Sequence, residues 1–567
     1  MNASRGFAVM ARIVITAGIV LSAGVAGRFG TQMRAAAARA DEHGQLLALF
    51  SEWRTFQKPP LVNGVPQYTL AAMNDQYTKL PEFQRRLAAL DPHGWIVPEQ
   101  IDWHLLRAEM NGLDFDQRVR KPWANDPAFY VTFYPSRSDQ PLREGPVPEG
   151  AIELWTYTFP LSAERANALD GAIRIIPPLL EQARTNLTGS GKDLWTYGAR
   201  RLREQSADLA ALATRVADTP GPLKQDVERA RAATDDFARW VEAQAASKTG
   251  TSGVGIDNYD WYLKHVQLVP YTWRDEVVLM QRELDRANAM LAMLEERDAR
   301  LPVLQPITDG AEYERRFTAA VDGYLTFLDT HGLLPMRPYF KPALMARMGR
   351  LDPGPREFFN EVNYRDPEIM LTHDYHWLDL ARLDREPNPN PIRQGPLLYN
   401  IFNTRTEGHA TGWEELMMNA GMLDDRPRSQ EMVYILVAER AARALGDLRM
   451  HANQITLEQS AQAAAAATPR NWLRLDARTV REEQELYLEQ PAYGTSYISG
   501  KIQFEALLSE QKRQLGDRFN MREVMDRFHA AGLIPTSLIR WELSGQLPPD
   551  VKAMLDDHEE RALSRPK

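Results

Sequence analysis

Two histidines and a glutamate have the types and spacing of a metal site. His373 and His376 lie three positions apart in the segment THDYHW (372–377). On a helix, side chains with this spacing share a face, so the two imidazoles could bind one metal ion. Glu407 follows in a second helical pattern, and two histidines with one glutamate form a known catalytic zinc site with a fourth position for water. We therefore take His373, His376 and Glu407 as candidate ligands and zinc as the candidate metal.

The same residues also fit a purely structural role. Buried histidines often hydrogen-bond to their neighbours, and Glu407 could pair with an arginine such as Arg405. Glu414 lies seven positions after Glu407, two helical turns, so both carboxylates share a face. The apolar residues of this helix gather on a different face: Trp413, Leu416, Met417 and Ala420. The helix would thus pack with one side and present carboxylates on another, and spacing alone leaves both roles open.

Composition narrows the class of protein. A chain of 567 residues exceeds the usual size of one hydrophobic core, so two lobes or domains are expected. Its hydrophobic share of 44% and charged share of 25% are typical of a globular protein. A net charge of -9 and the lack of a basic stripe with aromatics argue against nucleic-acid binding. Without cysteine, the chain has no disulfides, thiolate nucleophiles or cysteine-ligated clusters.

The N-terminus has the pattern of a signal peptide or anchor. Arg5 and Arg12 precede an apolar run at 13–26, which is short for a membrane span and ends in small residues. We expect residues 1–40 to direct export to the periplasm or beyond the cell, with membrane attachment only if this segment is uncleaved. We leave the oligomeric state open.

The remaining chain, residues 41–567, predicts a mainly α, multi-helix fold with a central cleft and a few short strands. Long amphipathic patterns fill 162–246 and 259–300. The glycine-rich segment at 248–258 predicts a break between two lobes, either a linker or a loop over the substrate. Residues 121–135 predict a break and then a short strand or extended run, and 135–148 predict a surface loop. Near the start of a late helix, Tyr497 and Lys501 are four positions apart and could line a pocket or lie on the surface.

Several segments resemble the bacterial domain-of-unknown-function family 885, whose members resemble zinc-dependent carboxypeptidases and related metallohydrolases. The resemblance runs from about residue 45 to about residue 545 and rests on these segments: IDWHLLRAEM (101–110), KPWANDPAFYV (121–131), GIDNYDWYLKH (255–265), TEGHATGWEELM (406–417), PAYGTSYISGK (491–501) and GLIPTSL (532–538). It implies a helical fold with a central cleft and a metal site built from an HExxPGH motif and a glutamate that opens an EGWA-like helix. Glu407 matches that glutamate. Tyr497, in the family's SY motif, would polarise a substrate carbonyl or oxyanion.

The chain departs from this pattern, because it has neither HExxPGH nor HExxH. Aligned on His376, it has Met370 and Leu371 in place of the family's first histidine and glutamate. His373 would then replace the first ligand, and Asp374 would stand in for the general base. On a regular helix, however, Asp374 points about 100° away from His373. His409 replaces the family's tryptophan and lies on the opposite side of its helix from Glu407, so we do not expect it to share the metal.

Three functions remain open. The first is a metal-dependent hydrolase of a peptide, amide or ester bond, with His373, His376 and Glu407 as ligands and catalytic roles for Asp374, Glu414 and Tyr497. The second is a metal-free lyase or isomerase that uses the histidines, Glu407 and Tyr497 for acid–base chemistry. The third is a binding protein without catalysis. The substrate would be a small molecule or a peptide, but the sequence does not identify it.

Overall fold

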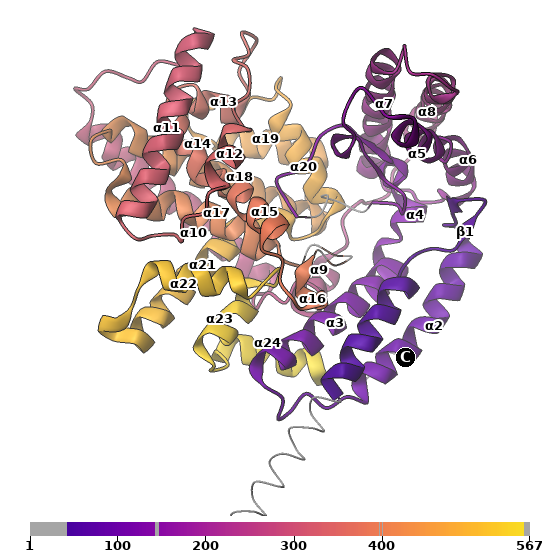
Figure 1. Ribbon diagram of the computed structural model, residues 1–567, viewed down its shortest axis with the longest axis horizontal. Coiled ribbons are helices and arrows are strands. Elements are labelled where there is room, and N and C mark those ends of the chain that lie inside the picture. The colour runs from indigo at the N-terminus through magenta and orange to yellow at the C-terminus, as the bar shows by residue number, and fades with distance from the viewer. Residues whose placement is uncertain (1–41, 142–146, 396, 398, 400, 561–567) are drawn as a thin grey trace, which may run out of the picture.

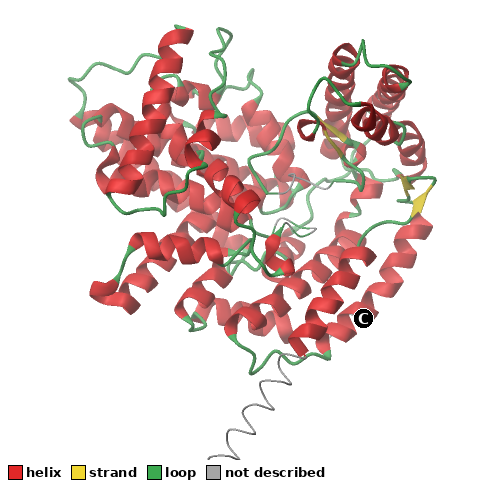
Figure 2. Cartoon of the chain, viewed as in Figure 1, coloured by secondary structure: helices red, strands yellow, loops and turns green. Residues whose placement is uncertain are grey.

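The computed structural model describes residues 42–141, 147–395, 397, 399 and 401–560. In this part the chain is mainly α-helical, and its strands form two short pairs, which confirms the predicted fold class (Figure 2). The predicted signal segment lies outside the described residues. No helix within the described part is long and apolar enough to cross a membrane.

Residues 122–250 form a separate helical lobe at the upper right of Figure 1. The lobe has its own hydrophobic core, built around residues such as Trp195, Phe237 and Val241. Helices α7 and α8 pack against each other, and β3 pairs with β4 in parallel. Its elements are α4 (Pro122–Asn125), η2 (Pro127–Tyr130), β3 (Phe133–Tyr134), β4 (Ile152–Glu153), η3 (Leu154–Thr156), α5 (Ala163–Ile173), α6 (Ile176–Asn186), α7 (Lys192–Arg215) and α8 (Leu223–Ala245).

The rest of the described chain forms the main body, with a second and larger core. Its N-terminal part comprises a helix at 42–56, the antiparallel pair β1 (Leu61–Val62) and β2 (Val65–Pro66), α2 (Leu70–Ala88), α3 (Val97–Phe115) and η1 (Asp116–Arg120). After the lobe follow α9 (Ile256–His265), α10 (Trp273–Arg297), α11 (Gly310–Thr330), α12 (Phe340–Met345), α13 (Phe358–Asn363), α14 (Pro367–His373), α15 (Tyr375–Arg385) and α16 (Pro391–Gln394). The C-terminal part comprises α17 (Asn403–Met417), η4 (Met418–Met422), α18 (Pro427–His451), α19 (Leu457–Ala467), η5 (Pro469–Asn471), α20 (Thr479–Glu489), α21 (Tyr493–Leu515), η6 (Gly516–Arg518), α22 (Met521–Ala530), α23 (Thr536–Ser544) and α24 (Pro549–Glu560).

Side chains and prolines at the helix starts explain several of these boundaries. Thr272 and Asp275 form a capping box at the start of α10, and Thr456 and Gln459 form another at α19. In both, a side chain satisfies a backbone N–H group that the helix leaves without a partner. Asp366 caps α14 in the same manner, and a proline follows it in the first turn. This cap fixes where α14 begins.

The chain enters and leaves the helical lobe at one place. The N–H of Gly189 donates to Ala124 O in the incoming segment, and the N–H of Gly250 in the outgoing segment donates to Ser190 O. Residues 188–192 therefore join the two connections. The predicted break at 248–258 falls on the outgoing connection, where the N–H of Gly255 then donates to His451 O at the end of α18.

Helices α17 and α18 lie in the centre of the main body and are buried on nearly all sides. Helix α17 packs on α21, and α18 packs on α10. Burial removes water from charged groups, so charges on these helices need partners. Arg440 on α18 meets this need with Glu414 on α17, and Arg443 pairs with Glu439 at 2.8 Å. The centre of the fold is therefore a charged network held within an apolar shell.

Candidate metal centre

Three helices bring His373, His376 and Glu407 together. His373 is the last residue of α14, His376 lies in the first turn of α15, and Glu407 lies on α17. One ligand atom from each residue lies within 4.8 Å of the other two. The helix is interrupted at Asp374, between the two histidines, so they do not lie on one regular helix. The two imidazole rings contact each other edge to face, with centroids 4.9 Å apart and planes at 81°.

His376 and Glu407 face each other in the interior. The imidazole Nε2 lies 3.3 Å from Glu407 Oε2, and the side chains are 3% and 2% exposed. Burial alone would lower the pKa of His376, but the charge of Glu407 outweighs it and raises the pKa to about 9. Burial likewise raises the pKa of Glu407, but His376 outweighs it and lowers the pKa to about 2. Glu407 is therefore a carboxylate at neutral pH.

The second oxygen of Glu407 is fixed by two neighbours. Tyr493 donates its hydroxyl to Glu407 Oε1 at 2.5 Å, and Gln140 donates from Nε2 at 2.9 Å. Glu407 Oε2 and His376 Nε2 remain buried without a hydrogen-bond partner of good geometry. The carboxylate is thus oriented by one oxygen, and its other oxygen is left available beside the imidazole.

His373 is held from behind by Glu414 and Arg440. Its Nδ1 lies 3.0 Å from Glu414 Oε1 and 3.0 Å from Arg440 Nη2. Arg440 also binds Glu414 through both terminal nitrogens, at 2.8 and 3.0 Å. Burial and the adjacent Arg440 hold the pKa of His373 well below its usual value, so the ring is neutral. Burial raises the pKa of Glu414 to about 7, against the opposing effect of Arg440.

Two imidazoles and one carboxylate are a donor set that zinc accepts, and here the three ligand atoms lie within 4.8 Å of one another. In a tetrahedral site with bonds of about 2.0 to 2.1 Å, neighbouring ligand atoms lie about 3.3 Å apart, which is the separation of His376 Nε2 and Glu407 Oε2. Both atoms lack another partner, as atoms reserved for a metal should. If Nδ1 of His373 donates its proton to Glu414, Nε2 becomes the free, metal-binding nitrogen. A carboxylate behind a ligating histidine is the usual arrangement in zinc sites.

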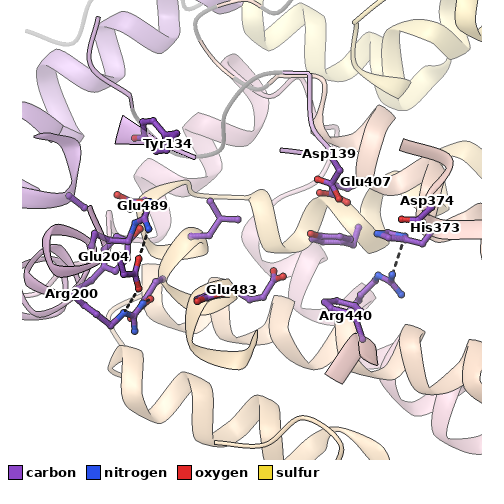
Figure 3. A pocket seen from close by; sticks show the side chains of 18 of the residues that line it. Tyr134, Asp139, Arg200, Glu204, His373, Asp374, Glu407, Arg440, Glu483 and Glu489 are labelled. Atoms are coloured by element: carbon purple, nitrogen blue, oxygen red, sulfur yellow. Dashed lines mark hydrogen bonds and ion pairs between the residues drawn. The ribbon is translucent and has the colours of Figure 1, made fainter. Parts of the chain in front are cut away.

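The site opens into a cavity of about 480 Å³ between the main body and the helical lobe (Figure 3). Asp374 and Tyr497, two predicted catalytic residues, line this cavity beside His373 and Glu407. The break at Asp374 explains why a regular-helix direction does not apply to its side chain. Burial and Asp139 raise the pKa of Asp374 to about 6, although Arg347 opposes them. Burial and Glu407 raise the pKa of Tyr497 well above 10, so its hydroxyl keeps its proton.

Other predicted site residues lie elsewhere. Glu414 is fully buried behind His373 and does not line the cavity, and its catalytic role stays a prediction. His409 packs in an aromatic cluster with Tyr375 and Phe504, away from Glu407. Lys501 lies 3.2 Å from Glu415 and 2.6 Å from Glu505, outside the cavity.

The structure shows the partner of Arg405 and corrects the expectation for the segment 135–148. Arg405 is not the partner of Glu407, because its guanidinium binds both oxygens of Asp379, at 2.5 and 2.9 Å. The segment 135–148 was expected to be a surface loop, which is wrong for Gln140. This side chain is buried and reaches Glu407, and Asp139 beside it lines the cavity. The sequence offered no signal for Gln140 or Asp139, because both lie in a segment rich in proline, serine and charge.

Part of the chain matches a known protein family. Residues 376–543 match the family described as "Bacterial protein of unknown function (DUF885)". This match covers Glu407 and Tyr497 and begins at His376. No curated protein matches the chain.

Two solved structures share the fold over most of the chain. One is described as a "putative lipoprotein of unknown function" from Shewanella oneidensis, with a TM-score of 0.62 and 16% identity over 89% of this chain and 98% of that one. The other is described as a "putative lipoprotein" from Colwellia psychrerythraea, with a TM-score of 0.61 and 15% identity over 92% of this chain and 100% of that one. At these identities the likeness shows the fold alone.

Proposed function

We propose that this chain, whose residues 376–543 match the bacterial family of unknown function DUF885, is a metal-dependent hydrolase of a peptide, amide or ester bond in a small substrate. One observation carries the proposal. Two buried ligand atoms without a well-aligned hydrogen-bond partner, His376 Nε2 and Glu407 Oε2, lie 3.3 Å apart and close to His373, and His373 and Glu407 line the cavity. Zinc is the proposed metal because the donors are two imidazoles and one carboxylate, with room for water.

In this proposal three residues bind the metal, and the residues around them hold these ligands in position. His373, His376 and Glu407 would hold the metal, which when bound lowers the pKa of its water to about 7 and polarises a carbonyl oxygen. Tyr493 and Gln140 orient Glu407 through its other oxygen. Glu414 orients His373 by accepting the Nδ1 proton, with Arg440 keeping this carboxylate in place.

Asp374 and Tyr497 would act on the substrate. Asp374 faces the cavity with a pKa of about 6, which suits a general base near neutral pH. None of the residues that the structure describes forms a hydrogen bond with the Tyr497 hydroxyl. Its raised pKa keeps the hydroxyl protonated. It would donate to the oxyanion that forms when the carbonyl is attacked.

Export to the periplasm or beyond the cell is part of the proposal. The N-terminal pattern supports it, and the two similar structures are described as lipoproteins. The sequence has no cysteine, so it offers no thiol for lipid attachment.

The test is the metal content of the purified chain, measured by mass spectrometry without a His tag or chelators. About one zinc per chain is expected, and His376→Ala and Glu407→Gln should lose it. His331→Ala is the matched control, because His331 is exposed and lies outside the site. A wild-type chain that takes up no metal after zinc is added would refute the proposal. Hydrolysis of amide and ester substrates by the zinc-loaded chain, absent in Glu407→Gln, would complete the support.

The hydrogen bond from Arg440 to His373 favours a second candidate. If Arg440 donates to Nδ1, the neutral ring carries its proton on Nε2 and is a proton donor rather than a ligand. His373, His376, Glu407 and Tyr497 would then form a metal-free acid–base site, as in a lyase or isomerase. The metal measurement separates the two, because this candidate requires an active chain without bound metal.

A further inference from the structure

The lining of the cavity shows which charge a substrate should carry. Figure 3 places Asp139, Glu407, Asp374 and His373 on one side of the cavity and Arg200, Glu204 and Glu489 on the other. In total the lining contains eight carboxyl groups but three arginines: Asp139, Glu204, Asp374, Glu407, Glu482, Glu483, Glu485 and Glu489 against Arg200, Arg201 and Arg440. A substrate therefore meets mainly acidic groups.

Each of the three arginines already has a carboxylate partner. Arg440 binds Glu414 at 2.8 Å. Arg201 binds Glu204 at 2.5 Å, and Arg200 pairs with Glu485. An anionic substrate would have to displace one of these partners, which would leave a carboxylate of the protein without its counter-charge.

Asp139, unlike these arginines, has no partner of opposite charge in contact with it among the described residues. The side-chain amide of its neighbour Gln140 donates a long hydrogen bond of 3.4 Å to Asp139 Oδ1. It also lies beside the carboxylate of Glu407. Two facing carboxylates repel each other unless a cation lies between or beside them.

Asp139 lies at the same end of the cavity as the proposed metal ligand Glu407. Glu407 is 2% exposed, and its Oε2 has no hydrogen-bond partner. Asp139 reaches the same place from the segment after β3, next to Gln140, which binds Glu407 at 2.9 Å. The Gln140 contact therefore fixes the position of Asp139 relative to the metal ligands.

We infer that Asp139 binds a protonated amine of the substrate, close to the bond that is cleaved. This inference rests on the proposed hydrolase. The substrate class is then amides, esters or short peptides with a free amine near the scissile carbonyl, such as a free amino terminus. Asp139 would act as a specificity residue, since its carboxylate contacts the ammonium group and not the reacting carbonyl.

The test compares ligands that differ only in this charge. Binding of L-leucinamide and N-acetyl-L-leucinamide is measured by calorimetry on the full zinc-loaded chain, and hydrolysis of leucine p-nitroanilide is compared with that of its N-acetyl form. The free amine should be preferred by about tenfold or more in affinity and in kcat/KM. Asp139→Asn should remove this preference, so that the free-amine and N-acetyl forms bind with similar affinity and are hydrolysed with similar kcat/KM.

Glu482→Gln is the matched control, because it removes one carboxylate from the same cavity at a half-exposed position. It should keep the preference for the free amine. Equal binding of the two amides by the wild-type chain, or an intact preference in Asp139→Asn, would overturn the inference. A chain that prefers the amine but holds no metal would refute the hydrolase and leave the cation site in place, so the two failures are distinguishable.

Discussion

Gly408 on α17 and Gly500 on α21 touch backbone to backbone, because neither residue has a side chain to keep the helices apart. A Cβ atom added to Gly408 would lie 2.2 Å from Gly500 Cα. Glu407 is the neighbour of Gly408 in sequence, and Tyr493 and Tyr497 lie on the opposing helix. The close approach of these two helices therefore sets the distance between the proposed ligand Glu407 and the two tyrosines of the site.

Gly408→Ala should destabilise the protein strongly, because the alanine methyl would collide with backbone atoms that cannot rotate away. We expect a loss of about 3 kcal/mol or more, measured by denaturant unfolding. Gly412→Ala on the same helix is the control, since its Cβ would make ordinary contacts of 3.5 Å or longer. A Gly408→Ala chain as stable as Gly412→Ala would show that α17 and α21 do not pack this closely.

Tyr493→Phe should weaken zinc binding. The change removes the hydroxyl that donates to Glu407 Oε1 but keeps the ring. Loss of an outer hydrogen bond to a ligand typically costs about 10- to 100-fold in metal affinity. Competition with a chromophoric chelator measures it. In the control Tyr487→Phe, the lost hydroxyl binds Glu483 at 2.9 Å instead, so zinc affinity should not change.

Tyr497→Phe should lower kcat of the proposed hydrolase by about 100- to 1,000-fold, because the oxyanion would lose its donor. The KM should change little, since this contact forms mainly in the transition state. Steady-state kinetics with a neutral amide or ester gives both constants. Tyr134→Phe lies in the same cavity, but its hydroxyl already donates to Val131 O, so its kcat should match the wild type. Equal rates for both variants would exclude the role of Tyr497.

Asp379→Asn should lower stability at neutral pH. Burial pushes the pKa of Asp379 up, but the charge and hydrogen bonds of Arg405 overcome this and hold the pKa well below its usual value. Removing one partner of a buried pair costs about 3 to 5 kcal/mol. The control Asp384→Asn breaks an exposed pair with Arg137 and should cost less than about 1 kcal/mol.

The pH dependence of this effect has a definite sign. Because the folded pKa of Asp379 lies below its unfolded value of about 4, the ion pair stabilises the fold above that pH and this stabilisation is lost as the pH falls further. The difference in thermal midpoint between the wild type and Asp379→Asn should therefore be largest at neutral pH and should shrink in acid. A difference that grows in acid would contradict this assignment.

Local patterns predicted the helices and the candidate ligand residues, because both depend on short spacings in the sequence. The mainly α fold, the short strand near 133 and the joining of His373, His376 and Glu407 at one place agree with the structure. The break at Asp374 was not predicted, since nothing in THDYHW marks a helix end.

Contacts between distant segments could not be predicted in this way. Gln140 meets Glu407 across 267 positions, and Arg440 meets Glu414 and His373 from a different helix. Such contacts depend on how the lobe and the central helices pack, which a single sequence does not encode in any local spacing. The choice of Asp379 rather than Glu407 as the partner of Arg405 has the same origin.

The helical lobe joins the main body through two neighbouring connections, and it supplies Tyr134, Tyr197, Arg200, Arg201 and Glu204 to the cavity wall. The proposed metal ligands all come from the main body. Residues 122–250 also contain Gln140, which binds Glu407 at 2.9 Å. Relatives could therefore acquire new substrates by exchanging residues 122–250 as one inherited unit, provided that the new segment keeps this contact.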